Sequence, residues 1–301
     1  MQPTSVLHVN SLVWINSLRP DEAGATRRVL EDLCPFLDSI VVPYEVFTPN
    51  NSVELISFLK GVAVVALQGS RPIIYFDMHG SRSQGLWIAS SEEFISWSSL
   101  VDVLRQINLA TNNNLCVISA ACFGLHVINS MTITKAVPFY ILIAPENKIS
   151  FGFVEDRMLK FYKSVFEELD VSNAHSLYLT PEFTLFHCEK MLAVSLTKYV
   201  LNHCFGKGGE TRRERLLTEA IIERGLPNNR GTRRSLRGQI RDLVKPTEAL
   251  LQKSADTFLV GRAVGFDMRQ LIKMAEKEIA ARDKDLARKR KLTNGTSYEK
   301  I

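Results

Sequence analysis

The stretch RPIIYFDMHGS, residues 71–81, runs from a short apolar segment directly into a histidine and a glycine. The segment PIIYFDM is nearly continuously apolar, which is typical of a strand buried on both faces of a parallel sheet. Ligands and reactive groups of such sheets lie at the carboxyl ends of the strands, and His79 falls at such an end. A reactive His79 would need a partner at the end of another buried strand.

The segments around this strand alternate between extended and helical patterns. Extended patterns occupy residues 5–16, 40–48, 114–122 and 137–145, and helical patterns occupy residues 19–40, 50–66, 96–110 and 151–169. Strands that alternate with helices in this way predict an α/β fold with a doubly wound, mostly parallel sheet. We place this predicted core at residues 1–170.

Strand signals fade beyond the predicted core, so residues 171–301 are expected to form an α-helical C-terminal extension. Residues 182–204 are interpreted as one long amphipathic helix, and a final run from about Thr247 to Leu292 is also compatible with helix. Between them, residues 205–245 combine glycine, asparagine and arginine. This composition favours a flexible, arginine-rich connector.

The net charge of +5 hides an uneven distribution along the chain. Residues 1–200 carry 14 lysines and arginines against 19 aspartates and glutamates, which gives a net charge of −5. The remaining residues carry 23 basic against 13 acidic side chains, which gives a net charge of +10. The two parts are therefore expected to attract different partners.

Features of membrane and secreted proteins are missing from the sequence. No apolar run approaches the roughly 18 residues of a membrane span, and the first residues lack the basic leader of a secretory signal. The five cysteines are scattered without CxxC spacing, so they indicate neither a disulfide framework nor a zinc ribbon. We expect a cytoplasmic protein with free thiols and without a metal or an organic cofactor.

A second buried strand ends in a nucleophile. In LCVISAACFG, residues 115–124, an apolar strand runs into a turn of small residues that contains Cys122. The strands of His79 and Cys122 are joined by a segment with one clear helix, so a right-handed crossover brings both residues to the same edge. His79 would then serve as general base and acid for the Cys122 thiol. The backbone N–H groups of Gly80 and Cys122 would form an oxyanion hole.

These motifs resemble those of the caspase-like cysteine proteases of clan CD. FDMHGS is similar to the His-Gly motif of that family, and SAACFG is similar to its Ala-Cys-x-Gly motif. The resemblance covers residues 5–170 and is strongest to the CHAT branch, the bacterial relatives of caspases. It implies a caspase-like fold and cysteine endopeptidase activity on protein substrates, carried by His79 and Cys122.

The resemblance does not carry over a substrate preference. Ala120 stands two residues before Cys122, where related enzymes have an aspartate or a glutamine that helps to bind the substrate side chain. Asp77 shares a strand face with His79 because side chains alternate with a period of two. It either lines a substrate pocket in place of that residue or simply ends the strand with a polar side chain.

Each candidate residue also has a purely structural interpretation. His79 would cap a strand, and Cys122 would be an inert thiol, as most free cysteines are. Cys116 lies earlier on the same strand and is expected in the core. His126 follows Cys122 by four residues, but a turn of helix after the nucleophile explains it more simply than a shared metal does.

Two His-Cys dipeptides, at residues 187–188 and 203–204, have the side chains of zinc ligands. They fall in one predicted helix, where 16 residues at about 1.5 Å per residue separate them by about 24 Å. They cannot share a metal in that arrangement, so no metal site is predicted.

Arginines are concentrated between residues 212 and 241. The cluster comprises Arg212, Arg213, Arg215, Arg230, Arg233, Arg234, Arg237 and Arg241. Such a cluster suits the phosphates of a nucleic acid or an acidic membrane surface, but aromatic residues for base stacking and known nucleic-acid motifs are missing. A solvated face, or a docking face for a regulatory protein partner, is favoured. A cleavage site and a clamp against the acidic N-terminal part remain as alternatives.

The sequence therefore predicts a cysteine endopeptidase that cleaves protein substrates in the cytoplasm. By resemblance alone, a role in bacterial defence or cell death is implied, such as cleavage of a gasdermin-like partner. The alternative is a catalytically inactive caspase-fold scaffold that binds a protein or nucleic-acid partner through its basic C-terminal region.

Overall fold

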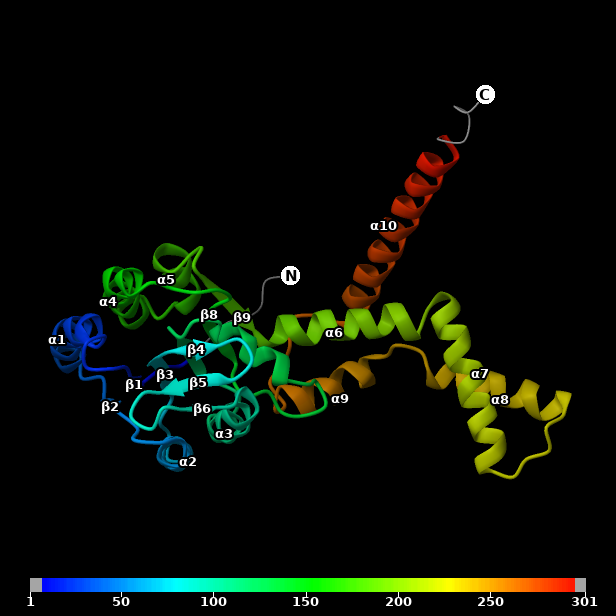
Figure 1. Ribbon diagram of the computed structural model, residues 1–301. Helices are drawn as coiled ribbons and strands as arrows, with labels where there is room; N and C mark the ends of the chain where they lie inside the picture. Colours follow the sequence, from blue (N-terminus) through cyan, green and yellow to red (C-terminus); the bar gives the residue numbers. More distant parts are fainter. Residues whose placement is uncertain (1–6, 296–301) are drawn as a thin grey trace. The chain divides into compact units, whose positions relative to one another are not determined.

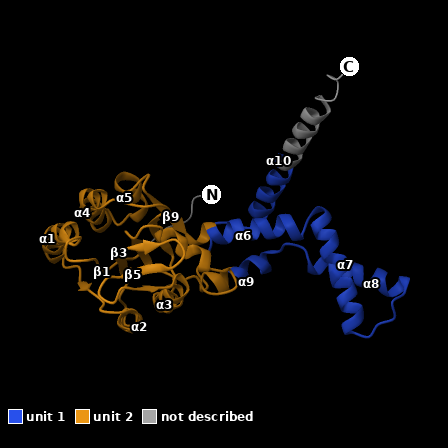
Figure 2. Cartoon of the chain, viewed as in Figure 1, with its two compact units in different colours: residues 1, 191–254, 264–301 blue, residues 2–190, 255–263 orange. Residues whose placement is uncertain are grey.

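The computed structural model describes residues 7–295, and the chain divides into two compact units (Figure 2). We call residues 2–190 with 255–263 the sheet unit, and residues 191–254 with 264–301 the helical unit. The predicted core ended at residue 170, whereas the sheet unit extends to residue 190 and includes a later segment of the chain. The boundary lies later because a further strand follows residue 170.

The sheet unit is built on a six-stranded sheet with the order β2-β1-β3-β7-β8-β9. Its strands are β1 (Ser11–Ser17), β2 (Tyr44–Phe47), β3 (Pro72–Met78), β7 (Cys116–Ser119), β8 (Ile141–Pro145) and β9 (Phe183–His187). Neighbouring strands are parallel except for β9, which runs antiparallel to β8. The predicted α/β class and the mostly parallel sheet are confirmed.

The position of β3 follows from its sequence. All seven of its residues are buried, as expected for a strand that is covered on both faces. Tyr75 lies in register with Trp14 of β1, and the centroids of the two rings are 4.0 Å apart. Burial of these rings and of the neighbouring aliphatic side chains stabilises β3 in the middle of the sheet.

Helices cover both faces of this sheet (Figure 1). One face is covered by α1 (Gly24–Ser39), α4 (Phe151–Glu168) and α5 (Val171–Tyr178), and the other by α2 (Ser52–Leu67) and α3 (Trp97–Ala110). This is the doubly wound arrangement that the alternation of patterns predicts. The observed bounds of α2, α3 and α4 lie within two residues of the predicted ranges.

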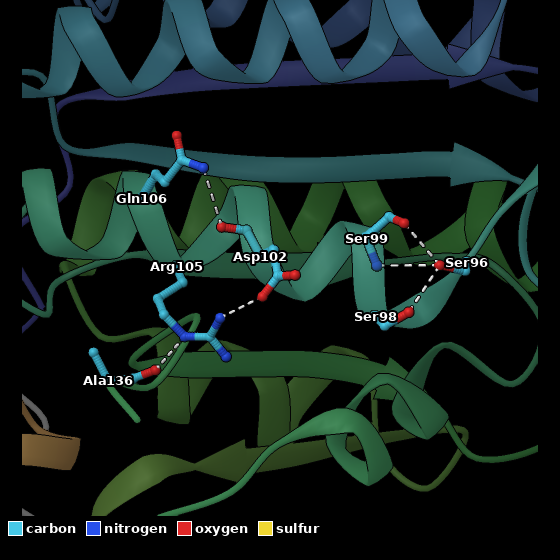
Figure 3. Close-up of polar contacts among 7 residues, drawn as sticks. All are labelled: Ser96, Ser98, Ser99, Asp102, Arg105, Gln106 and Ala136. Carbon is cyan, nitrogen blue, oxygen red and sulfur yellow. Dashed lines mark hydrogen bonds and ion pairs between the residues drawn. The ribbon is translucent and has the colours of Figure 1, made fainter. Parts of the chain in front are cut away.

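Polar contacts hold the start and the middle of α3 (Figure 3). Ser96 caps the helix, because its Oγ accepts a hydrogen bond from the Ser99 N–H at 3.1 Å. Further along, Arg105 donates from Nε to the carbonyl oxygen of Ala136 at 2.6 Å and from Nη1 to Asp102 at 2.6 Å. Arg105 thus links α3 to the segment that precedes β8.

A small antiparallel sheet follows His79 directly. It consists of β4 (Gly80–Ser81), β5 (Gly85–Ile88) and β6 (Glu93–Ile95). The carbonyl oxygen of His79 accepts a hydrogen bond from the Trp87 N–H at 2.8 Å. The backbone of His79 is therefore fixed by β3 on one side and by the small sheet on the other.

The expectation of one helix over residues 182–204 is wrong in its first part. β9 occupies Phe183–His187, and α6 (Cys188–His203) begins directly after it. The whole of β9 pairs in register with β8, and this pairing satisfies backbone groups of the segment. Apolar residues are so frequent there that extended and helical periods both fit, and pairing with the sheet decides between them.

The expectation of a flexible connector at residues 205–245 is also wrong. Two helices fill this range, α7 (Gly206–Glu223) and α8 (Arg230–Leu243), and they pack against each other in the helical unit. Their contact is a cluster of buried aliphatic side chains: Leu217, Ile221, Leu236, Ile240 and Val244. These residues recur every four positions, which places them on one face of each helix.

Two helices replace the predicted run from Thr247 to Leu292. α9 (Glu248–Phe258) ends well before α10 (Met268–Gly295) begins. The end of α9 and the residues after it belong to the sheet unit, where the Phe258 carbonyl accepts a hydrogen bond from the Val137 N–H at 2.9 Å. None of the helices in the described part of the chain combines the length and the apolar character that crossing a membrane requires.

Candidate active site

Three strands bring their carboxyl ends to one edge of the sheet. β2 lies on one side of β1 and β3 on the other, so the winding of the chain reverses between β1 and β3. Such a reversal opens the crevice in which α/β sheets bind their ligands. His79 follows β3 directly and Cys122 lies three residues after β7, so both residues fall at this edge on adjacent strands.

The turn after His79 contacts the turn that carries Cys122. A Cβ atom on Gly80 would lie 2.2 Å from the carbonyl oxygen of Cys122 and 3.1 Å from the Cβ of Ala121. Only glycine allows two backbones to approach so closely. The structure therefore brings the histidine motif and the cysteine motif together, although they are distant in the sequence.

The backbone N–H of Gly80 lies outside the ladder between β4 and β5. Gly80 pairs with Leu86, and the neighbouring hydrogen bond runs from the Trp87 N–H to the His79 carbonyl. Hydrogen-bonded and non-hydrogen-bonded pairs alternate in antiparallel ladders, so Gly80 and Leu86 form a pair of the second kind. The Gly80 N–H is directed away from β5, as an oxyanion-hole donor would need to be.

Cys122 lies in a tight turn between β7 and the short 3₁₀ helix η1 (Gly124–Ser130). The next residue, Phe123, has a φ of 60°, a left-handed conformation that is rare for bulky side chains. Its N–H donates to the carbonyl oxygen of Asn147 at 3.1 Å, which holds the turn. The half-buried Cys122 Sγ lies 4.0 Å from the carbonyl oxygen of Ile149. The loop between β8 and α4 therefore flanks the thiol.

The other cysteines are poorly suited to act as nucleophiles. All five thiols are free, and Cys116, Cys188 and Cys204 are buried. Burial raises the pKa of Cys116 to about 12 and also raises the pKa of the Cys188 and Cys204 thiols. Desolvation raises the pKa of the half-buried Cys34 as well. Because the thiolate is the reactive form, none of these four groups favours nucleophilic chemistry.

A carboxylate that the sequence analysis missed contacts His79. Glu22 Oε2 lies 2.9 Å from His79 Nε2 and also accepts a hydrogen bond from the Arg19 N–H at 3.2 Å. The hydrogen bond with His79 is the main cause that lowers the pKa of Glu22, so this carboxyl is ionised at neutral pH. An ionised partner assigns the proton of neutral His79 to Nε2 and leaves Nδ1 as the acceptor. Glu22 follows β1, and β1 neighbours β3 in the sheet. Its place after a strand beside that of His79 is the sequence feature that could have identified Glu22 as a site residue.

Asp77 is buried beneath the site and does not line an open substrate pocket. It is 4% exposed, and Thr26 Oγ1 donates a hydrogen bond to its Oδ2 at 2.5 Å. Burial raises the pKa of Asp77 to about 6, and the hydrogen bond from Thr26 opposes this rise. The indole of Trp14 lowers the pKa too, although its N–H lacks the alignment of a full hydrogen bond. The pocket expectation is thus corrected: Asp77 anchors the first turn of α1, directly after Glu22.

Aromatic rings and an arginine surround the site. The ring of Phe151 lies edge-on to His79, with centroids 5.9 Å apart. The guanidinium of Arg82, in the turn between β4 and β5, lies 5.2 Å from the centroid of the Phe123 ring. Ala120 is only 8% exposed, and its N–H donates to the Phe76 carbonyl at 2.9 Å. Ala120 thus extends the pairing of β3 with β7 toward Cys122 and supplies no charge for substrate binding.

The remaining histidines do not gather into a metal site. Within the described ranges, no group of three or more histidine, cysteine, aspartate or glutamate side chains could hold a metal ion. His187 ends β9 and His203 ends α6, so a whole helix separates the two His-Cys dipeptides. Burial lowers the pKa of His187 to about 4, which keeps it neutral. His126 lies on η1 with its Nδ1 3.4 Å from the side-chain nitrogen of Asn129.

The arrangement at the sheet edge contains the groups that nucleophilic acyl transfer requires. A half-buried thiol lies in a turn, an imidazole lies at the end of the adjacent strand, and a carboxylate orients the imidazole. The turn of Gly80 contacts the turn of Cys122, which is where the predicted oxyanion hole would lie.

Comparisons with known proteins do not extend this picture. No protein-family model matches the chain, and no curated protein matches it at a significant level. The functional interpretation therefore depends on the geometry at the edge of the sheet.

Proposed function

We propose that the chain is a cysteine endopeptidase of the caspase-like type, with Cys122 as the nucleophile and His79 as general base and acid. The observation that carries the proposal is the meeting of three elements at one edge: Glu22 after β1, His79 after β3 and Cys122 after β7. A thiol, an imidazole and a carboxylate form the general pattern of an activated nucleophile; here the carboxylate contacts the imidazole, and the turns that carry imidazole and thiol contact each other. Glu22 adds an orienting group to the predicted pair.

In the proposed reaction, His79 Nδ1 accepts the proton of the Cys122 thiol, and the thiolate attacks the carbonyl carbon of the scissile peptide bond. The N–H groups of Gly80 and Cys122 bind the oxyanion of the tetrahedral intermediate. His79 then donates its proton to the departing amine as the C–N bond breaks, which leaves a thioester on Cys122. Water, deprotonated by His79, hydrolyses the thioester and restores the thiol.

Glu22 has a positioning role in this scheme. Its carboxylate accepts the hydrogen bond from Nε2, which fixes the ring orientation and stabilises the imidazolium formed when the thiol is deprotonated. The acid does not need to take a proton itself, because its lowered pKa keeps it ionised. Glu22 thereby supplies the third member of a triad.

The test is to map the new protein N-termini that the chain generates in a cytoplasmic extract. We expect defined new N-termini with the wild-type chain and a loss of at least about a thousandfold in their rate of formation with Cys122→Ala. Cys34→Ala is the matched control, because Cys34 is the other half-buried thiol and lies on α1. Cleavage that survives Cys122→Ala unchanged would refute the protease assignment and favour the scaffold alternative.

A second pair of variants separates the role of Glu22 from general charge effects. Glu22→Gln keeps the size of the side chain but removes the charge that faces His79, so we expect kcat to fall on the order of a hundredfold. Glu31→Gln makes the same change at an exposed position of α1 and should leave kcat unchanged. Equal activity of both variants would remove Glu22 from the triad without touching the assignment of Cys122.

A further inference from the structure

The helical unit contains a cavity that the proposed protease chemistry does not use. Its volume is about 540 Å³, and it lies where the last turns of α6 meet the first turns of α7. The lining residues are Tyr199, Asn202, His203, Gly208, Thr211, Arg212 and Arg215. Cavities between about 300 and 1,000 Å³ are the usual size for small-molecule sites.

The two helices approach closely at the wall of this cavity. A Cβ on Gly208 would lie 2.1 Å from the carbonyl oxygen of Asn202, and one on Gly209 would lie 2.7 Å from that of Cys204. Any larger residue at Gly208 would separate the helices. This close approach of the backbones fixes the junction of α6 and α7, and the cavity opens to solvent beside it, with exposed residues such as Asn202 and Thr211 in its lining.

The side chain of Arg212 lines this cavity, and one nitrogen of its guanidinium lacks a hydrogen-bond partner in the described part of the chain. Its guanidinium lies over the ring of Tyr199, 5.1 Å from the ring centroid. The Tyr199 ring also contacts the His203 ring, with the two centroids 5.4 Å apart. Arg212 Nη1 is shielded from solvent, yet it has no hydrogen-bond partner among the described residues. A shielded donor without an acceptor is costly, and because the Arg212 side chain lines the cavity, a rotation of its guanidinium would bring Nη1 to an acceptor bound there.

The charges around the cavity have one sign. Arg212 and Arg215 line it, and the described lining residues include no aspartate or glutamate. Of the nearby acids, Glu214 accepts two hydrogen bonds from Arg237, at 3.0 and 3.1 Å, and Glu219 lies 3.4 Å from the lining residue Arg215 at the surface and partly offsets its charge. An anion is the ligand that this electrostatic environment favours.

We propose that this cavity binds a small organic phosphate with a planar ring, of the size of a mononucleotide. A guanidinium donates two parallel hydrogen bonds to a phosphate, which would satisfy Arg212 Nη1. The hydroxyl of Thr211 and the amide of Asn202 offer further polar contacts. The Tyr199 ring is contacted by Arg212 and His203, and a heterocycle would pack against the exposed ring of His203 at the edge of this group. This proposal does not depend on the proposed protease chemistry, and its test does not measure protease activity.

The test is isothermal titration calorimetry of the full chain in phosphate-free buffer at low salt. The probes are AMP, GMP, CMP and UMP, the corresponding nucleosides, and inorganic phosphate. We expect at least one nucleotide to bind with a Kd at least tenfold below that of its nucleoside, and inorganic phosphate to compete for the same site. Arg212→Gln should raise that Kd at least tenfold.

Arg234→Gln is the matched control, because Arg234 is exposed on α8 and does not line the cavity. It should change the Kd less than twofold. Circular dichroism checks that Arg212→Gln is folded, and Thr211→Val, which removes only a lining hydroxyl, takes its place if it is not. The proposal is overturned if none of the four nucleotides binds at millimolar concentration, if nucleosides bind equally well, or if Arg234→Gln weakens binding as much as the cavity variants do.

Discussion

The candidate active site of the sheet unit and the cavity of the helical unit differ in how their charged side chains are paired. In the sheet unit the important charges are carboxylates with partners in the fold, since Glu22 contacts His79 and Asp77 accepts a hydrogen bond from Thr26. In the helical unit the important charges are guanidinium groups, and Arg212 Nη1 has no acceptor among the described residues. Paired carboxylates hold reactive side chains in place at the candidate active site, whereas the unmatched Arg212 donor gives the cavity of the helical unit a group that an external acceptor could satisfy.

The contact between the two motifs of the sheet unit gives the largest expected effect. In Gly80→Ala, the added Cβ meets the Cys122 carbonyl oxygen at 2.2 Å, and backbone atoms must move to relieve the overlap. We expect kcat/KM for peptide cleavage to fall on the order of a thousandfold, or about 4 kcal/mol in transition-state stabilisation. Substrate peptides for the assay come from the mapped cleavage sites.

Gly61→Ala is the control for this substitution. Gly61 lies on α2, and no atom within 4 Å would meet its Cβ. Activity should remain unchanged, and stability should rise by about 0.5–1 kcal/mol because alanine favours helix. Wild-type activity in Gly80→Ala would mean that the close approach of the two turns has no part in the function of the sheet unit.

The buried carboxyl of Asp77 gives a smaller effect, which depends on pH. Burial raises its pKa from 3.8 to about 6, so the folded state binds more protons than the unfolded state between these values. The stability of the wild-type chain should therefore fall as pH rises from about 4 to 6 and then level off, by about 3 kcal/mol from this group. Asp77→Asn removes the titration and should flatten the profile.

The measurement for Asp77 is urea unfolding of both proteins across this pH range. The Asn variant is the more stable protein above pH 6 if its side-chain oxygen accepts the hydrogen bond from Thr26 as the carboxylate does. Parallel profiles for the two proteins would contradict the assignment of the raised pKa to Asp77 and would weaken the contrast between the units.

The hairpin of α7 and α8 gives the smallest expected effect. Leu236→Ala removes a buried side chain from the cluster between the helices, and we expect a loss of about 2 kcal/mol in the stability of this hairpin. Leu243→Ala, at a position that is 78% exposed, should change it by less than about 0.5 kcal/mol. Amide hydrogen exchange across residues 206–243 measures both. Unprotected exchange of these amides in the wild-type chain would contradict the packed hairpin and support the predicted flexible connector.

The sequence predicted well the elements whose environment is uniform. β3 was found residue by residue because a strand covered on both faces must be continuously apolar. α3 was found because Ser96 caps a clear amphipathic pattern. The placement of His79 and Cys122 at the same edge followed from the parallel topology, since adjacent parallel strands end on the same side.

The sequence failed where long-range contacts decide the structure. The pattern of β9 predicts helix, because only the pairing with β8 distinguishes strand from helix there, and that pairing joins residues far apart in the chain. Glu22 is 57 residues from His79, so no local motif reveals their contact. The composition of residues 205–245 concealed the four-residue spacing of Leu217 and Ile221, which the glycines and arginines around them outnumber.

The return of residues 255–263 to the sheet unit determines what a break in the chain would do. Asn113 holds this segment twice, by a hydrogen bond from its amide to the Leu259 carbonyl at 3.0 Å and by one from Arg262 to its own carbonyl at 2.7 Å. A single peptide-bond cut between residues 205 and 245 would therefore yield a two-chain protein whose halves co-elute until denaturant separates them. A truncated gene that stops at residue 190 would lack a piece of its own first domain.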